Sequence, residues 1–190
     1  MFKGQTGKDQ GGKPREHAPD AHDGPSHGVT IRPAKLLDGT YIAYLSDQVF
    51  GIFGSYGPVI SQWFASSRCR TLMAIAEKGP VGFVMIGPRY KDWGSSVTSE
   101  VLAIAVDPEH QTKGIGSMLL EAMEEKAEEM HVEQLVLHTA SKNKAALHLF
   151  ETHGFRLKRS ISRFYPRGQD ALEMVKVIPR KGGIPRRGIR

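Results

Sequence analysis

The segment from Val101 to Ser117, with the sequence VLAIAVDPEHQTKGIGS, constrains the fold of this chain more than any other stretch. Its first six residues are apolar and rich in β-formers, which is typical of a buried strand. The Asp-Pro pair that follows ends the strand, because proline has no N–H to donate to a neighbouring strand. Two glycines, Gly114 and Gly116, come next, and the apolar positions after them repeat with a helical period. We therefore expect a strand, a glycine-bearing turn and a helix in direct succession.

That turn has the properties of an anion-binding site. Glycine lets the backbone approach a ligand closely, and the first N–H groups of a helix lack partners and lie at the positive end of its dipole. A phosphate is the typical occupant of such a turn. The glycine spacing in this turn differs from the GxxxxGK[ST] spacing of a nucleotide P-loop. The turn also lacks the third glycine of the dinucleotide-binding pattern GxGxxG. From the turn alone, an ordinary strand–turn–helix connection also stays open.

A second sequence segment, further along the chain, supports a specific interpretation of this turn. The short strand Leu135–His138 is followed by Ser141-Lys142-Asn143 and by a helical segment that ends in LFETHGF. In this order, the two blocks resemble the coenzyme A pyrophosphate loop and the following N-x-x-A-x-x-L-Y-E-x-x-G-F segment of the GNAT acyltransferase superfamily. The resemblance covers Val29 to Ile178 and is strongest from Val101 to Phe155.

The order of the expected elements agrees with this resemblance. We expect strands at residues 29–33, 70–76, 80–87, 98–106, 134–139, 155–164 and 171–178. We expect helices at residues 36–52, 59–65, 114–130 and 143–153. Consecutive strands without helices between them indicate an antiparallel half-sheet, whereas a strand–helix–strand crossover indicates a parallel pair. The predicted fold class is therefore α/β (α+β), a GNAT-like mixed, mostly antiparallel sheet with a splayed central parallel pair, flanked by helices.

The chain length of 190 residues suits one domain, which we place at residues 28–178. Residues 1–27 have almost no apolar side chains and equal numbers of acidic and basic ones, so we expect a disordered tail. Residues 179–190 contain five basic residues and no acidic residue, which accounts for most of the net charge of +6. Such a tail can bind nucleic acid, but we expect a solvated extension and no nucleic-acid partner.

The cysteine content and the lengths of the apolar runs indicate the compartment and the partners of the chain. The single cysteine, Cys69, cannot form an internal disulfide, which favours a reducing, cytoplasmic location. No apolar run approaches the roughly 20 residues of a membrane span, and no segment is typical of a signal peptide. We expect a monomer or homodimer without a membrane partner.

The resemblance implies acetyl-CoA as a cosubstrate and no metal. Backbone N–H groups of the turn would hold the pyrophosphate, the end of the strand before it would pair with the pantetheine arm, and the later block would face that arm. The implied cofactor-binding residues are Ile104, Ala105, Val106, Gln111, Thr112, Lys113, Gly114, Ile115, Gly116, Ser117, Asn143 and Phe150.

Acyl transfer to an amine needs a base that removes a proton from the nitrogen. His138 ends a short apolar strand at the expected splay, and the ordinary pKa of histidine suits this task near neutral pH. Glu100, at the start of the central strand, is the second candidate. Phe150 stands where many relatives have a tyrosine and cannot donate a proton. Either the thiolate leaves without a dedicated acid, or another group, such as Ser141 or a water, protonates it.

The sequence before the last strand, Arg163-Phe164-Tyr165-Pro166, resembles the aromatic segment with which N-terminal peptide acetyltransferases hold their substrate. Tyr165 of this segment is therefore a candidate substrate-binding residue. The resemblance also implies that the first two helices and their loop form one wall of the acceptor site, which makes Tyr56 a second candidate, while Trp63 and Phe64 either line that site or belong to the core. We interpret the chain as an N-acetyltransferase that acts on a protein or peptide N-terminus. The alternatives are a small-molecule amine acetyltransferase (polyamine, amino acid or aminoglycoside) and a non-catalytic CoA-binding module.

Overall fold

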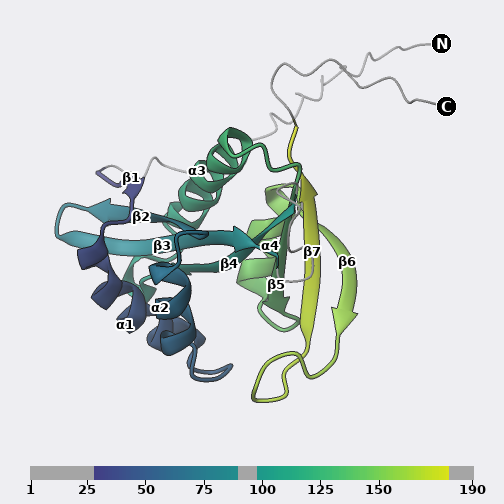
Figure 1. The fold of residues 1–190 in the computed structure, drawn as a ribbon. Coiled ribbons are helices and arrows are strands. Elements are labelled where there is room, and N and C mark those ends of the chain that lie inside the picture. The colour runs from purple at the N-terminus through teal and green to yellow at the C-terminus, as the bar shows by residue number, and fades with distance from the viewer. Residues whose placement is uncertain (1–27, 90–97, 180–190) are drawn as a thin grey trace, which may run out of the picture.

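A computed structural model describes residues 28–89 and 98–179 of the chain (Figure 1). The expected disordered tail lies outside these residues, and so does the basic tail apart from Pro179. No helix in the described ranges has both the length and the apolar character that a membrane span requires.

The described strands form one sheet in the order β1-β2-β3-β4-β5-β7-β6. The strands are β1 (Thr30–Pro33), β2 (Arg70–Ala76), β3 (Gly79–Pro88), β4 (Thr98–Val106), β5 (Gln134–Ala140), β6 (Arg156–Ile161) and β7 (Ala171–Val177). The helices are α1 (Gly39–Phe50), α2 (Gly57–Ala65), α3 (Ile115–Glu129) and α4 (Lys144–Thr152). Neighbouring strands are antiparallel except for β4 and β5, which run parallel. The predicted fold class is confirmed.

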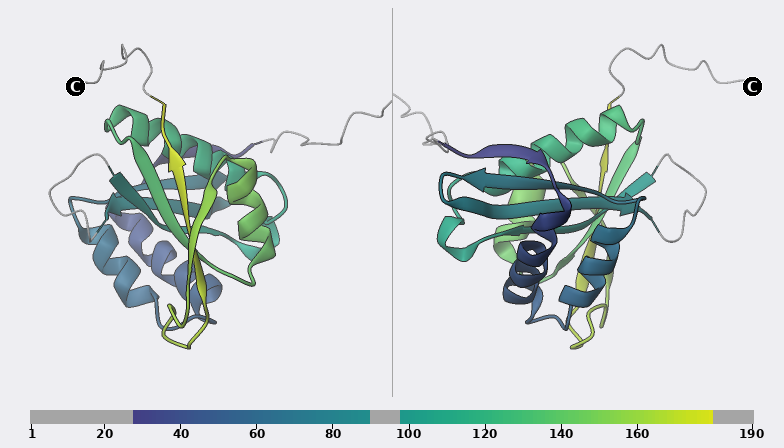
Figure 2. Two further views of the ribbon diagram at one scale, coloured as in Figure 1. Left: turned by 90° about the vertical axis from the view of Figure 1, so that its right-hand side faces the viewer. Right: turned by 60° about the vertical axis from the view of Figure 1, so that its left-hand side comes forward.

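Helices cover both faces of this sheet, because its strands are apolar on both sides (Figure 2). On one face α1 and α2 bury Ile42, Leu45 and Ile60 against the inner strands. On the other face α3 packs through the buried residues Ile115, Leu119, Leu120, Met123 and Ala127. The helical period of the sequence predicts a buried face made of Ile115, Met118, Leu119, Ala122, Met123, Ala127 and Met130. Of these, Met118, Ala122 and Met130 are only half-buried, and Leu120, which the pattern left out, is buried.

Strand β4 contains a bulge that separates it from β5. Met85 of β3 pairs with Ala103 while the next residue, Ile86, pairs with Val101, so Leu102 is an extra residue in β4. The parallel pairing of β4 with β5 runs from Thr98–Gln134 to Val101–Leu137 and ends there. Because a bulge bends the strand that carries it, the two strands diverge beyond this point. The expected splay of the central parallel pair is present, and it starts at Leu102.

The first helix begins later than its apolar pattern predicted. Leu36–Asp38 forms a 3-10 turn, and α1 starts at Gly39. The side chain of Asp38 accepts a hydrogen bond from the backbone N–H of Lys35 at 2.6 Å and pairs with Arg32 at 2.7 Å. This anchored carboxylate stabilises the tight turn, and Leu36 and Leu37 are left exposed.

A side chain of α1 caps α2 and thereby sets the connection between them. The residue before α2, Tyr56, provides no side-chain cap, but Oδ1 of Asp47 accepts a hydrogen bond from the N–H of Gly57 at 3.1 Å. A Cβ atom at position 57 would lie 2.5 Å from the same oxygen, so a larger residue here would displace the Asp47 side chain from its capping position. The contact closes the loop that carries Phe53 and Tyr56.

We expect Asp47→Ala to lower the free energy of unfolding by about 1 kcal/mol, because it leaves an N-terminal N–H of α2 without its acceptor. Urea denaturation measures this loss. Asp47→Asn keeps an acceptor oxygen and should lose less, and Glu77→Ala in the exposed β2–β3 turn should stay within about 0.5 kcal/mol. Equal stability of the Ala and Asn variants would contradict the capping role.

Candidate active site

Two adjoining cavities open at the divergence of β4 and β5. The first, of about 560 Å³, is lined by residues of the α1–α2 region, both diverging strands and the segment before β7. The second, of about 700 Å³, lies between the end of α1, the β5–α4 connection and the β6–β7 loop. The two share Phe50, Phe53, Ile104, Ala140 and Asn143. The gap between the strands is therefore accessible from two directions.

The turn between β4 and α3 has the geometry of an anion-binding loop. Gly114 is the N-cap of α3 with φ at 75°, a left-handed conformation that favours glycine, and no side chain caps the helix. Oδ1 of Asp107 accepts from the N–H of Glu109 at 3.0 Å, which holds the turn after β4. The first N–H groups of α3 are thus left for an external acceptor, as the pyrophosphate of CoA would require.

The side chains of the turn fold back onto its own backbone. Nε2 of Gln111 donates to the carbonyl oxygen of Val106 at 3.0 Å, and Nζ of Lys113 donates to that of Glu109 at 2.8 Å. The hydroxyl of Thr112 donates to the carbonyl oxygen of Gln111. The side chain of Ile115 belongs to the core, so only its backbone can face a ligand. The turn therefore offers backbone N–H groups to an anion, with side chains that stiffen it.

Further residues that the sequence assigned to the cofactor lie at the cavities. Ile104 and Asn143 line both cavities, whereas Ala105 is buried in the core. Oδ1 of Asn143 accepts from the N–H of Ala146 at 3.1 Å and so caps α4. Phe150 lines the first cavity, is 3% exposed and lies edge-on to Phe155. These residues fit an arm that passes between β4 and β5.

Both candidate bases meet on the wall of the first cavity. Nδ1 of His138 lies 2.8 Å from Oε1 of Glu100, although the two residues are 38 positions apart in the sequence. The exposed fraction is 13% for the His138 side chain and 21% for that of Glu100. The ring of Phe164 stacks on the imidazole with the ring centres 4.6 Å apart. The sequence named these two groups as alternatives, and the structure joins them in one hydrogen bond.

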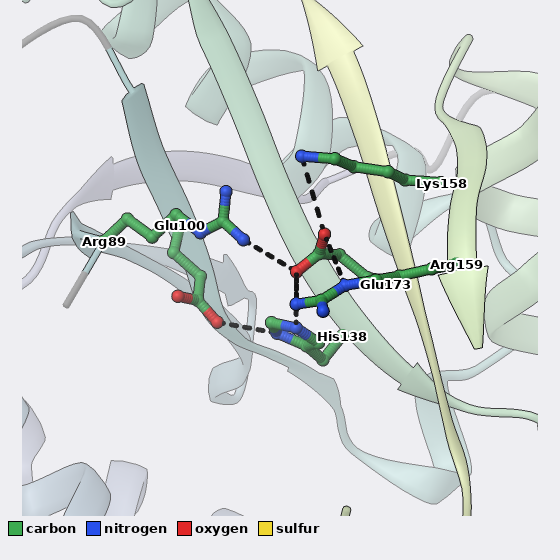
Figure 3. A network of polar contacts seen from close by, with 6 residues as sticks. All are labelled: Arg89, Glu100, His138, Lys158, Arg159 and Glu173. Carbon is green, nitrogen blue, oxygen red and sulfur yellow. Dashed lines mark hydrogen bonds and ion pairs between the residues drawn. The ribbon is translucent and has the colours of Figure 1, made fainter. Parts of the chain in front are cut away.

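The second nitrogen of His138 contacts a residue that the sequence did not single out. Nε2 of His138 lies 3.2 Å from Oε2 of Glu173, whose side chain is 1% exposed (Figure 3). Arg89 and Arg159 both donate to Glu173, at 2.7 and 3.1 Å. Burial alone would raise the pKa of Glu173, but the hydrogen bonds from Arg159 and the charges of both arginines lower it to about 2. An isolated glutamate in an alternating strand gave no sequence signal of this contact.

Aromatic residues form the side of the first cavity that faces α1 and α2. Tyr165 stacks on Phe53 at 4.7 Å between ring centres and lies edge-on to Tyr56. Burial raises the pKa of both tyrosines, so their hydroxyl groups stay protonated at neutral pH and can donate hydrogen bonds. Trp63 also lines the cavity. Phe64 instead lies against Gly39 of α1, in agreement with its core alternative.

No group of three or more His, Cys, Asp or Glu side chains suited to a metal ion occurs in residues 28–89 and 98–179. The described site offers a carboxylate–imidazole pair, phenol hydroxyls and backbone N–H groups.

Comparison with known proteins agrees with this geometry. The model of the acetyltransferase (GNAT) family matches residues 34–155. An N-alpha-acetyltransferase from Saccharolobus solfataricus is 31% identical over 116 residues, which cover 56% of this chain and 68% of the relative. The chain belongs to the acetyltransferase (GNAT) family and is an acetyltransferase.

Two solved structures show the same fold. The first is yncA from Salmonella typhimurium with its cofactor acetyl-CoA, with a TM-score of 0.72 and 20% identity, covering 83% of this chain and 98% of that one. The second is spermidine N-acetyltransferase from Vibrio cholerae in complex with CoA and spermine, with a TM-score of 0.64 and 19% identity, covering 79% and 95%.

We expect Gly114→Glu to weaken CoA binding at least about tenfold, because it adds a carboxylate and a strained backbone where the pyrophosphate is expected. Isothermal titration with CoA measures the change. Gly154→Glu is the matched control, since Gly154 also has a left-handed φ, of 82°, but follows α4 and lines neither cavity. Unchanged affinity in the Gly114 variant would refute the assignment of the turn.

Proposed function

We propose that the chain transfers the acetyl group of acetyl-CoA to the N-terminal amine of a protein or peptide. The observation that carries the proposal is the Glu100–His138 hydrogen bond on the wall of the first cavity, beside the gap between β4 and β5. The name of the N-alpha-acetyltransferase relative supports the same class of acceptor.

The donor is expected to bind across the divergence of the two strands. Its pyrophosphate would accept hydrogen bonds from the N–H groups at the start of α3, and its pantetheine arm would enter beyond Val101 and Leu137. Asn143, which lines both cavities, would flank the arm. The thioester would then reach the first cavity, which holds the proposed base.

Glu100 and His138 would act as one proton acceptor. The neutral ring has a single N–H, while its two nitrogens lie 2.8 Å from Glu100 and 3.2 Å from Glu173. A proton taken from the ammonium group of the acceptor gives the ring a second N–H, so that the ring donates to both carboxylates at once.

The transfer then needs little further chemistry from the protein. The lone pair of the deprotonated nitrogen attacks the thioester carbon, the C–S bond breaks, and the thiolate of CoA leaves. The second proton of the nitrogen ends on that thiolate, directly or through water. Because Phe150 cannot donate a proton, positioning of the two reactants must supply much of the acceleration, for which about 7–11 kcal/mol is available.

The lining of the first cavity favours a peptide over a polyamine. Among the described residues that line it, Glu100 is the carboxylate and Arg68 the guanidinium, while Phe50, Phe53 and Trp63 are aromatic. A polyamine carries several positive charges that need carboxylate partners on desolvation. The hydroxyl groups of Tyr56 and Tyr165 can instead donate to the carbonyl groups of a peptide.

Thiol release from acetyl-CoA tests the acceptor directly, with short peptides of different first residues, spermidine and free amino acids as acceptors. We expect peptides with an uncharged first side chain to give kcat/KM values at least about tenfold above that of spermidine. Release with small amines alone would replace the peptide proposal with metabolite acetylation. Absence of release with every acceptor, while CoA still binds, would overturn it.

We expect His138→Gln to lower kcat about 100-fold or more, because glutamine can hydrogen-bond to both carboxylates but cannot accept a proton. CoA affinity should not change. His148→Gln, at an exposed position of α4, is the matched control and should keep full activity. A decrease in kcat of less than fivefold in the His138 variant would instead assign the rate acceleration to Glu100, or to proximity of the two reactants alone.

A further inference from the structure

The second cavity continues the first on the side of α1. The two adjoin along Phe50 and Phe53, beside Tyr165, whose ring stacks on that of Phe53. The volume of the second cavity, about 700 Å³, is typical of pockets that hold a ligand. An acceptor whose amine lies at Glu100 and His138 can therefore extend past the two phenylalanines into this second space.

Two cations from distant parts of the sequence line the second cavity. Lys142 lies in the connection between β5 and α4, and Arg167 lies in the loop between β6 and β7. Neither side chain forms a hydrogen bond or an ion pair within residues 28–89 and 98–179. Asp170 also lines this cavity, but its Oδ1 accepts a hydrogen bond from the backbone N–H of Arg163 at 2.8 Å. The described lining therefore has an excess of positive charge, carried by side chains without an anionic partner there.

Backbone hydrogen bonds hold the segments that carry these two cations. The N–H of Arg167 donates to the carbonyl oxygen of Phe53 at 3.3 Å, which ties the β6–β7 loop to the α1–α2 loop. The N–H of Ser141, next to Lys142, donates to the carbonyl oxygen of Asp170 at 3.0 Å, which ties the β5–α4 connection to the same loop. Because these segments are joined before a ligand binds, an anion has to order only the ends of two side chains.

We propose that the second cavity is a subsite for an acidic side chain of the acceptor peptide, whose carboxylate pairs with Lys142 and Arg167. The proposal rests on the proposed function, because it takes the amine of the same peptide to lie in the first cavity. It adds a preference for Asp or Glu close to the N-terminus, after the first residue. A guanidinium binds a carboxylate through two parallel hydrogen bonds, and the lysine adds a second charge. A cationic side chain in this place would meet two like charges.

The phosphates of CoA are the other source of an anion at this site. The turn assigned to the pyrophosphate is centred on Gly114, which lines neither cavity, so the proposal takes the anion from the acceptor. Isothermal titration of Lys142→Gln and Arg167→Gln with CoA distinguishes the two sources. We expect affinities within about twofold of the wild type. A larger loss of CoA affinity, with the peptide preference unchanged, would assign the two cations to a CoA phosphate and overturn the proposal.

Thiol release from acetyl-CoA with matched peptides measures the preference. The peptides share an uncharged first residue and an amidated C-terminus, and they carry a single Asp, Asn or Lys at the second, third or fourth position. At one of these positions we expect kcat/KM for the Asp peptide to be about tenfold above that of the Asn peptide, with the Lys peptide lowest. Added salt should reduce this ratio, because both cations are exposed and salt screens their charges.

Substitution of Arg167 tests whether the preference comes from this cavity. Arg167→Gln should reduce the Asp-over-Asn ratio to about twofold, and Arg167→Glu should reverse it in favour of Lys. Arg156→Gln on β6 and Lys144→Gln at the start of α4 are the matched controls, since both residues are exposed and line neither cavity. Both controls should keep the ratio of the wild type. An equal reduction in the controls would trace the ratio to overall charge and refute the subsite.

Peptide titration in the presence of CoA separates the subsite from the reaction, because CoA carries no acetyl group to transfer. Acid-selective binding that depends on Arg167, without acetylation of any peptide, would refute the proposed function and support the subsite. Equal binding and equal turnover of the Asp and Asn peptides at every position would refute the subsite, even if all of them are acetylated. Turnover of free amino acids alone would assign the cations to an α-carboxylate and refute both proposals.

Discussion

The end of pairing between β4 and β5 is the constraint on which the rest of the site depends. A single extra residue, Leu102, bends β4 just after Val101, and the two parallel strands then separate. Gly87 lies opposite the bulge on the neighbouring strand β3, where a Cβ atom would lie 2.7 Å from Cδ1 of Leu102 and would displace that side chain. Beyond Val101, β4 and β5 no longer form ladder hydrogen bonds with each other, which leaves a gap in the sheet. Two adjoining cavities open along it, and both are lined by Ile104 and Asn143.

Charge in this protein is organised across the sheet rather than along the chain. The net charge of +6 resides largely in the last residues, while at the site three cations on separate segments of the chain surround one buried carboxylate. Burying Glu173 would be costly if it stood alone. Arg89, Lys158 and Arg159 offset that cost.

The sequence predicted the parts of the site that depend on local order. The glycine-bearing turn is a local structure, since a strand, an Asp-Pro stop and a helix start fix its backbone together, and Gly114 has the left-handed φ that this requires. His138 was identifiable because it ends a short apolar strand. Glu173 was not, because one glutamate in the alternating strand ALEMVKV looks like a solvent-facing residue until its neighbours are known.

The sequence by itself determined the order of strands and helices, the expected anion-binding turn and the family, because these follow from periodicity, turn chemistry and motif spacing within short segments. Only the tertiary structure decided which charges meet. Strand β7 inserts between β5 and β6, and this brings Glu173 next to His138, 35 residues away, and next to Arg89, 84 residues away. Such contacts arise from strand order, which depends on packing between distant segments that no local pattern records.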